Sequence, residues 1–354
     1  MLYRENGQFK SSYVSDQQML PILQDRLFMF GLVAFAFVGV PLLAGDYLYL
    51  SILIPFLILA LAAIGLNLLV GYCGQISIGH AAFMSIGAYA AYNLALRVPQ
   101  LNFLVVLVLA GLVAAAAGML FGIPSLRIKG LYLAVATLAA QFFTDWLFAR
   151  VKWFTNYSHS GSVSTAPVEL FGWRIDTPVE KYLFLLGVLI VFTLVAKNLV
   201  RGHLGREWMA MRDMDVAAEV IGIRPVYAKL TAFAVSSFYC GVAGALYGFL
   251  YLGSWEPLAF NLTLSLNLLF MIIIGGMGSL LGSYLGAAFI VILPIVLDQI
   301  PQWFGIPMTT ATTSHLAFMI FGALIVFFLI VEPHGLARLW AIGKEKLRLW
   351  PFPH

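Results

Sequence analysis

Residues 47–96 read YLYLSILIPFLILALAAIGLNLLVGYCGQISIGHAAFMSIGAYAAYNLAL, a stretch without a single Asp, Glu, Lys or Arg. A membrane-spanning helix needs about 20 apolar residues to cross roughly 30 Å of hydrocarbon. The stretch is therefore long enough for two spans, with the glycines Gly71, Gly74 and Gly79 between them. It predicts a membrane protein whose helical pattern is interrupted by glycine.

The rest of the chain has the same character. Hydrophobic residues make up 62% of its 354 residues and charged residues only 10%, with a mean hydropathy of +0.93. Because a soluble domain typically carries about 25% charged residues, most of this surface must face lipid. The apolar runs are continuous and lack the alternation of β-barrel strands, so the spans are helices. We expect an all-α polytopic membrane protein with about ten transmembrane helices and glycine-broken segments in both halves.

Charge placement predicts the orientation. Fifteen of the 20 Lys and Arg residues fall on the side of the N-terminus and five on the other, which places both termini in the cytoplasm by the positive-inside rule. The net charge of +4 needs no nucleic acid to explain it. We expect a multi-pass protein in the lipid bilayer of the bacterial inner membrane. Its parts are a cytoplasmic N-terminal segment (1–26), a transmembrane domain (27–331) with an outer loop (151–181) and an inner loop (201–228), and a cytoplasmic tail (332–354).

The inner loop carries the pattern of a short amphipathic helix. Residues 201–225 read RGHLGREWMAMRDMDVAAEVIGIRP, and Glu207–Ile221 contains no Pro or Gly. Gly222 is expected to end this helix. At helical spacing its apolar stripe consists of Met211, Met214, Ala218 and Ile221. The stripe is covered either by the membrane interface and the protein's own helix ends or by a groove on a cytoplasmic partner, and periodicity alone does not choose between them.

Two glycine-broken segments occupy corresponding places in the two halves of the chain. Leu66–Tyr92 reads LNLLVGYCGQISIGHAAFMSIGAYAAY, and Leu266–Ile290 reads LNLLFMIIIGGMGSLLGSYLGAAFI. Broken backbone at membrane depth is tolerated only inside protein or beside water, so paired interruptions indicate a transport pathway. The same glycines also suit close helix packing. The candidate pathway residues are Asn67, Gly71, Gly74, Gln75, Ser77, Gly79, His80, Gly275, Gly276, Gly278 and Ser279.

Motifs for catalysis and for nucleotide binding are absent from the sequence. It has no G-x-x-x-x-G-K-[ST] loop, no G-x-S-x-G elbow and no H-E-x-x-H helix, and its six His residues lack metal-ligand spacing. Charged residues fall at the ends of the expected spans, so no intramembrane proton relay is visible. We expect no catalytic residue, no cofactor and no metal site, and an energy source outside this chain.

Five ordered blocks carry a resemblance to a known family. They are GYCGQISIGHAAFMSIGAY (71–89), GLYLAVATLAAQ (130–141), GREWMAMRDMDVAAEVIG (205–222), KLTAFAVSSFYCGVAGALY (229–247) and IGGMGSLLGSYLG (274–286). Together they resemble the LivM-type permease subunits of branched-chain amino acid ABC importers, over nearly the whole chain after its first 45 residues.

The resemblance implies partners and a coupling segment. The partners would be a homologous second permease subunit, two cytoplasmic ATPase subunits that bind the ATP, and a periplasmic substrate-binding protein. Residues 205–222 would be the coupling helix, although their Ala-Ala-Glu order departs from the E-A-A-x-x-x-G pattern of other ABC permeases. The implied coupling residues are Arg206, Met211, Arg212, Asp213, Met214, Glu219 and Gly222.

We expect a non-catalytic permease subunit that moves branched-chain amino acids or related small solutes across the inner membrane, driven by ATP hydrolysis on partner subunits. The alternatives are a self-sufficient secondary transporter or channel for small polar solutes, an ABC permease for amides, urea or aromatic acids, and a polytopic membrane enzyme. Many relatives have a glycine-rich, acidic T-G-G-x-x-G stretch in the outer loop, where residues 160–164 here read SGSVS. The sequence therefore leaves the substrate open.

Overall fold

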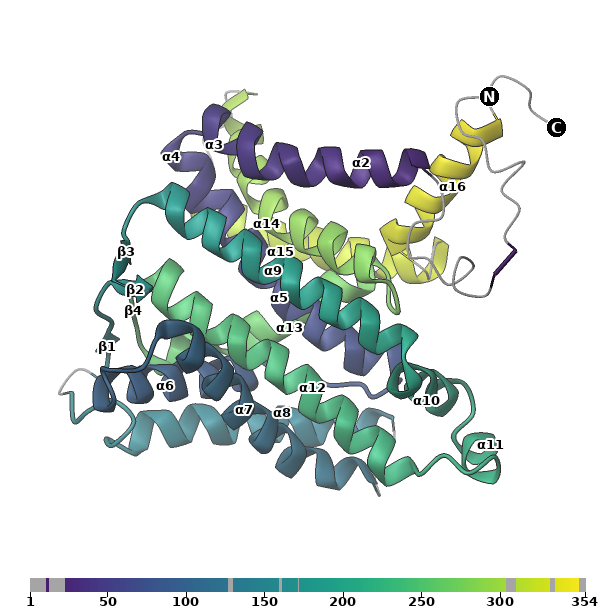
Figure 1. Cartoon of the computed structure of the whole chain (residues 1–354), viewed down its shortest axis with the longest axis horizontal. Coiled ribbons are helices and arrows are strands. Elements are labelled where there is room, and N and C mark those ends of the chain that lie inside the picture. Colours follow the sequence, from purple (N-terminus) through teal and green to yellow (C-terminus); the bar gives the residue numbers. More distant parts are fainter. Residues whose placement is uncertain are drawn as a thin grey trace.

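The computed structural model describes residues 11–12, 23–126, 130–158, 161–170, 172–303, 310–331 and 335–349. Much of the predicted N-terminal segment, parts of the C-terminal tail and Ser160 of the outer loop lie outside these residues. The described chain is a bundle of long helices (Figure 1). The long helices are α2 (Leu23–Ala34), α5 (Ile54–Asn67), α6 (His80–Arg97), α7 (Phe103–Gly122), α8 (Leu131–Arg150), α9 (Pro178–Arg201), α12 (Pro225–Leu246), α13 (Leu262–Gly275), α14 (Leu280–Trp303), α15 (Thr310–Val331) and α16 (Gly335–Leu349).

Shorter elements extend or connect these helices. Several are π-helical or 3-10 turns that continue a long helix, as η3 continues α5 and η5 continues α12. The short helical elements are η1 (Phe35–Gly39), α3 (Val40–Leu43), α4 (Asp46–Leu48), η2 (Tyr49–Leu53), η3 (Leu68–Tyr72), η4 (Ile123–Leu126), α10 (His203–Asp213), α11 (Asp215–Val220), η5 (Tyr247–Leu252) and η6 (Pro257–Phe260). The strands are β1 (Val163–Ser164), β2 (Val168–Leu170), β3 (Trp173–Ile175) and β4 (Ser254–Trp255).

The predicted all-α membrane architecture is confirmed. Eight helical stretches of the described chain are long and apolar enough to span a membrane. They are Asp25–Leu43, Asp46–Tyr72, Phe103–Gly122, Tyr132–Arg150, Pro178–Arg201, Pro225–Leu252, Pro257–Gly275 and Leu280–Leu297. The other two of the roughly ten predicted spans fall on α6 and α15. Helix α6 carries the polar residues His80, Ser85 and Asn93, which are buried in the protein and lower its hydropathy.

The spans that contain α5 and α12 form the centre of the bundle, in purple-blue and green in Figure 1. Within the protein, 83% of the Asp46–Tyr72 window and 78% of the Pro225–Leu252 window are buried, whereas the Asp25–Leu43 window is 0% buried and can only face lipid or another subunit. Helices α6 and α12 approach so closely at Gly87 that an added Cβ would overlap the carbonyl oxygen of Gly241. Small residues at such crossings are typical of helix packing in lipid.

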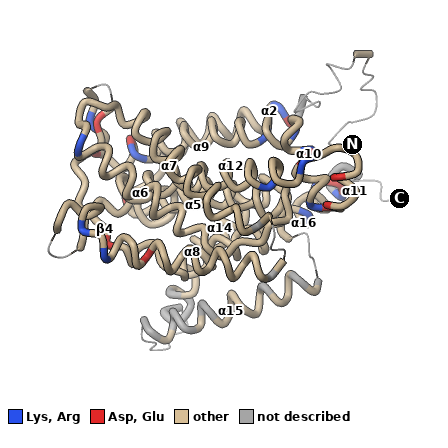
Figure 2. The backbone as a smooth tube through the Cα atoms, turned by 90° about the horizontal axis from the view of Figure 1, so that it is seen from below, with Lys and Arg blue, Asp and Glu red and all other residues tan. Residues whose placement is uncertain are grey.

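The two ends of the bundle differ. At one end β1 pairs with β4 and β2 pairs with β3, each antiparallel; we call it the strand end. The other, called the α10 end, holds α10, α11, α16 and the first turn of α2, where Lys344 forms an ion pair with Asp25 at 3.0 Å. Charged residues gather at these two ends and are sparse between them (Figure 2). This is the charge distribution of a protein whose middle lies in hydrocarbon.

Packing at the α6–α12 crossing gives a first prediction. Replacing Gly87 with Val should lower the thermal midpoint of the purified protein by several degrees, because overpacking typically costs about 1–3 kcal/mol. The matched control is Gly187→Ala on α9, where an added Cβ meets nothing within 4 Å. Thermal unfolding measured in the same detergent should separate the two variants, and equal midpoints would contradict the packing described here.

Candidate functional site: two broken helices joined to the α10 segment

The first break follows the span Asp46–Tyr72. Helix α5 continues through η3 to Tyr72, residues 74–77 have no regular structure, and α6 begins at His80. In the second half of the chain, α13 ends at Gly275 and α14 begins at Leu280. Gly276 between them has φ +125°, a conformation that strongly favours glycine. The structure therefore places helix interruptions where the sequence predicted them.

Asn67 joins the two breaks. Its Nδ2 donates to the carbonyl oxygen of Ser279 at 2.8 Å and to Oγ of Ser283 at 2.9 Å, while its Oδ1 accepts from the backbone N–H of Gly278 at 2.8 Å. The Asn67 side chain is fully buried. One amide thus gives the N–H of Gly278 a partner and adds a second donor to the carbonyl oxygen of Ser279, which also accepts from the N–H of Ser283.

Gly71 lies against the same turn. A Cβ added there would overlap both Oδ1 of Asn67 and the backbone nitrogen of Gly278. We call Asn67, Gly71 and the turn Gly276–Ser279 the glycine junction. Of the predicted pathway residues, the structure brings Asn67, Gly71, Gly276, Gly278 and Ser279 together here, with Gly275 packed against α14 next to them.

Ser77, Gly79 and His80 belong to a neighbouring buried cluster. The Oγ of Ser77 lies 2.7 Å from Nδ1 of His80, and Nε2 of His80 lies 2.8 Å from Oγ of Ser236 on α12. Both ring nitrogens therefore have hydrogen-bond partners, and His80 is 0% exposed. A Cβ added to Gly79 would overlap the carbonyl oxygen of Thr137 on α8. These side chains hold the start of α6 against α8 and α12.

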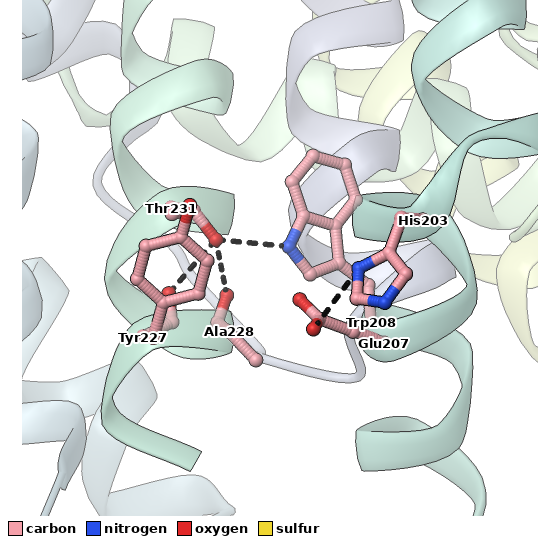
Figure 3. Close-up of polar contacts among 6 residues, drawn as sticks. All are labelled: His203, Glu207, Trp208, Tyr227, Ala228 and Thr231. Carbon is pink, nitrogen blue, oxygen red and sulfur yellow. Dashed lines mark hydrogen bonds and ion pairs between the residues drawn. The ribbon is translucent and has the colours of Figure 1, made fainter. Parts of the chain in front are cut away.

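The α10 segment is fixed to the bundle by a buried tryptophan. Trp208 is 0% exposed, and its Nε1 donates to Oγ1 of Thr231 on α12 at 3.1 Å (Figure 3). Thr231 in turn donates to the backbone oxygens of Tyr227 and Ala228. Leu204, Trp208 and Met211 have the spacing i, i+4 and i+7, a signal in the sequence that would have found this anchor.

Arg212 connects α10 to the glycine junction. Its Nη1 donates to the carbonyl oxygen of Gly71 at 2.9 Å, and its Nε and Nη2 lie 2.9 Å from Oδ1 of Asp213. A cavity of about 300 Å³ adjoins this contact. It is lined by Gly74, Gln75, Gly130, Met211, Arg212, Asp213, Met214, Asp215 and Lys229, so Gly74 and Gln75 of the first break face the α10 segment. Residues at the end of a membrane helix thus touch a helix outside the membrane directly.

The prediction of one continuous helix from Glu207 to Ile221 was wrong. The chain is extended at Met214, with φ −156° and ψ 96°, so α10 and α11 are separate helices. An aspartate stands on each side of the break: Asp213 accepts from Arg212, and Oδ1 of Asp215 accepts from the N–H of Val216. The bond of Asp215 to the backbone is of the kind that competes with helix continuation.

The break also splits the predicted apolar stripe. Met211 and Ala218 are buried, at 4% and 2% exposure, whereas Met214 and Ile221 are 70% and 74% exposed. Three other predicted coupling residues, Arg206, Asp213 and Glu219, are exposed as well. The exposed apolar side chains of this segment, called the α11 patch below, are Met214, Val216, Val220 and Ile221.

Gly222 ends the α11 helix, as the sequence predicted. Its φ is +94°, its N–H donates to the carbonyl oxygen of Glu219, and the N–H of Ile223 donates to that of Ala218, both at 3.0 Å. This pair of bonds is the Schellman arrangement that satisfies the last carbonyls of a helix. The reversed chain then enters α12 at Pro225.

Comparison of the sequence with known protein families assigns the chain to one of them. The family model described as "Branched-chain amino acid transport system / permease component" matches residues 48–329, a range that includes both breaks and the α10 segment. The chain belongs to this family. No solved structure matches it.

Curated relatives of this permease family cover most of the chain. The LivM proteins of Salmonella typhimurium and Escherichia coli, both described as high-affinity branched-chain amino acid transport system permease proteins, are 31% and 32% identical over 306 residues. These matches span 79% of this chain and 68% of each relative. A "Probable branched-chain amino acid transport permease protein LivM" of Methanocaldococcus jannaschii is 23% identical over 80% of this chain and 92% of its own length.

The glycine junction generates a second prediction. Replacing Asn67 with Leu should destabilise the permease, because each buried group left without a hydrogen-bond partner costs about 1–3 kcal/mol. Here the N–H of Gly278 and the hydroxyl of Ser283 would lose their partner. The control is Asn198→Leu, which changes an exposed Asn on α9. A thermal midpoint lowered only by Asn67→Leu is the expected result, and equal midpoints would show that the junction contributes nothing to stability.

Proposed function

We propose that this permease is the membrane subunit of an ABC importer that carries branched-chain amino acids across the bacterial inner membrane, without catalytic residues or a cofactor of its own. ATP would be bound and hydrolysed by two partner ATPases. The observation that carries the proposal is the direct contact of Arg212 with Gly71, because it connects the α10 segment to the helix break at the end of a membrane span. The match to a family of transport-system permease components also supports this proposal.

The proposed orientation places the α10 end in the cytoplasm. The sequence puts most Lys and Arg residues on this side, in agreement with the positive-inside rule. The described parts of both terminal helices, α2 and α16, meet at this end through the Asp25–Lys344 pair. The strand end then faces the periplasm, where a substrate-binding protein would deliver the solute. A homologous second permease subunit would complete the passage.

The α11 patch is the proposed docking surface for an ATPase. Four apolar side chains of this segment are exposed, and such a patch commonly marks a protein interaction site. A short amphipathic helix often binds in a hydrophobic groove on a partner protein. The exposed Arg206, Asp213 and Glu219 would form the polar rim of this contact. Met211 is buried, so in this proposal it supports α10 from inside and does not touch the ATPase.

Movement of the ATPase would reach the membrane through two fixed contacts. Trp208 bonds α10 to α12, and Arg212 bonds α10 to the end of η3. Displacing α10 would therefore displace the glycine junction, and with it the ends of α5 and α13. Rigid-body movement of helices around a fixed set of contacts is a general route to alternating access.

The amino-acid substrate is proposed from the names of the relatives. Three LivM proteins from two bacteria and one archaeon are described as branched-chain amino acid permeases. Uptake of radiolabelled leucine, isoleucine and valine by the complete transporter in proteoliposomes tests this proposal. An amide, urea or an aromatic acid accumulated in their place would assign the chain to another branch of the family. Accumulation by this chain alone, without ATPase subunits, would instead support a self-sufficient transporter.

The Arg212 contact gives a third prediction. Replacing Arg212 with Met removes the donor to Gly71 and keeps a long side chain, and a lost charge-assisted hydrogen bond of about 1.5–3 kcal/mol should reduce uptake roughly tenfold or more. ATP hydrolysis by the assembled complex should continue. Arg224→Met, at an exposed position before α12, is the control. The ratio of solute transported to ATP hydrolysed measures coupling, and an unchanged ratio in Arg212→Met would refute the assigned role.

The α11 patch gives a fourth prediction. Replacing Val220, which is 83% exposed, with Glu should release the ATPase subunits, since a charge would be buried in an apolar contact. Tyr157→Glu makes a comparable change at the strand end, where Tyr157 is 67% exposed. Co-purification in detergent should lose the ATPases only for Val220→Glu. Retention of the ATPases by this variant would move the docking surface elsewhere.

A further inference from the structure

Gln141 lies at the middle of α8, a helix long and apolar enough to span the membrane. It is the eleventh residue of α8, so about 15 Å of helix separates it from either end. It is fully buried; its Nε2 donates to the carbonyl oxygen of Phe260 at 2.8 Å, and its Oε1 accepts from Oγ of Ser265 at 3.0 Å. The backbone at Phe260 therefore lies near mid-depth, although β4, five residues earlier in the chain, pairs with β1 at the strand end.

The chain thus enters the membrane from the strand end without a full helix. After β4, residues 257–260 form only the short η6 turn, and α13 begins at Leu262 with Asn261 as its N-cap. The Oδ1 of Asn261 accepts from the N–H of Leu264 at 3.1 Å. Helix α6 starts at the same depth, since the N–H of Ala81 donates to Oγ of Ser265 at 2.8 Å. The outer half of this crossing is irregular backbone.

This irregular segment is exposed on the surface of the subunit. Asn261 and Thr263 are both exposed, and Leu258 is 69% exposed. Asp145, which accepts from Nε2 of Gln141 at 2.9 Å, lies partly exposed one turn further along α8. Irregular backbone and polar side chains at this depth are tolerated beside water or protein and are not tolerated against lipid tails.

Helix α7 shows what a lipid-facing surface of this subunit looks like. Leu112 stands at the middle of α7, at the depth of Gln141 on α8, and it is 53% exposed. Its exposed neighbours Val108 and Val113 are apolar as well. The face that contains Asn261 and Thr263 differs from this surface both in its backbone and in its side chains.

Three of the predicted pathway residues, Asn67, Ser77 and His80, are not exposed on any face of the subunit. Asn67 and His80 are 0% exposed, Ser77 is 1% exposed, and each has hydrogen-bond partners inside the subunit. They hold helices together at the glycine junction and at the start of α6. A route for a polar solute needs polar groups that are exposed at mid-depth, and among the described residues Asn261 and Thr263 meet that condition on one face.

We propose that Asp145, Asn261 and Thr263 line the water-filled translocation passage, on the face where this subunit meets the second permease. The inference deepens the proposed transport function and depends on it. The half-crossing of residues 256–261 then forms the wall of the passage on the periplasmic side. The amide of Asn261 and the hydroxyl of Thr263 replace water around the charged groups of a permeating amino acid, and the carboxylate of Asp145 favours its ammonium group.

Thiol accessibility in the complete transporter tests this assignment. The two native cysteines, Cys73 and Cys240, are free and buried, and would be replaced by Ala to give a cysteine-free background. In this background, single cysteines replace Asn261, Thr263 or the apolar, exposed Leu112. The reconstituted variants are then treated in proteoliposomes with MTSET, a membrane-impermeant cationic thiol reagent. Thiols in water ionise and react, whereas thiols in hydrocarbon do not.

Asn261→Cys and Thr263→Cys should react at least about tenfold faster than Leu112→Cys, and their modification should block uptake. An excess of leucine should slow the reaction. Thr263→Cys leaves the N-cap of α13 intact, so this variant alone tests the assignment if Asn261→Cys does not fold. Both cysteines reacting no faster than Leu112→Cys, at rest and with the ATPases trapped by vanadate, would overturn the assignment. Fast labelling together with ATP-independent uptake would instead contradict only the proposed energy source.

Discussion

Backbone groups inside a membrane must find partners within the protein, and every special feature of this permease follows from that constraint. The turn between α13 and α14 at Gly276 interrupts the backbone hydrogen bonding of the two helices. Asn67, from the other half of the chain, bonds the N–H of Gly278, the carbonyl oxygen of Ser279 and Oγ of Ser283. Arg212 does the same for the carbonyl oxygen of Gly71. The broken helices are therefore held by specific side chains.

The same bonds connect the helix breaks to the α10 segment. If Asn67 alone bonded the backbone at the break, its hydrogen bonds would only hold the helices together. Because Arg212 belongs to α10, which lies outside the membrane and is anchored by Trp208, the junction is also connected to the surface that a partner can reach. The breaks then serve two purposes: they allow the ends of α5 and α13 to shift, and they transmit the force that shifts them.

Much of this architecture could be predicted from the sequence, and the failures have physical causes. Charge-free runs located the spans, and the repeated Leu-Asn-Leu-Leu motif placed both glycine breaks correctly. Helical periodicity did not detect the extension at Met214, because the bond of the Asp215 side chain to the backbone N–H of Val216 is local and leaves the apolar spacing unchanged. A contact between residues 212 positions apart, such as that of Asn67 with Ser279, cannot be predicted from a single sequence. Asn261 was overlooked because one polar residue in an apolar run does not reveal its depth or exposure.

Backbone hydrogen exchange in residues 68–80 tests the central claim most directly, with the complete transporter compared at rest and with its ATPases trapped by vanadate. We expect trapping to change exchange in this segment in the wild-type protein, because α10 pulls on Gly71 through Arg212. In Arg212→Met the change should disappear while ATP hydrolysis continues. An equal change in both proteins would show that the break senses the ATPases by another route, and the proposed connection would be wrong.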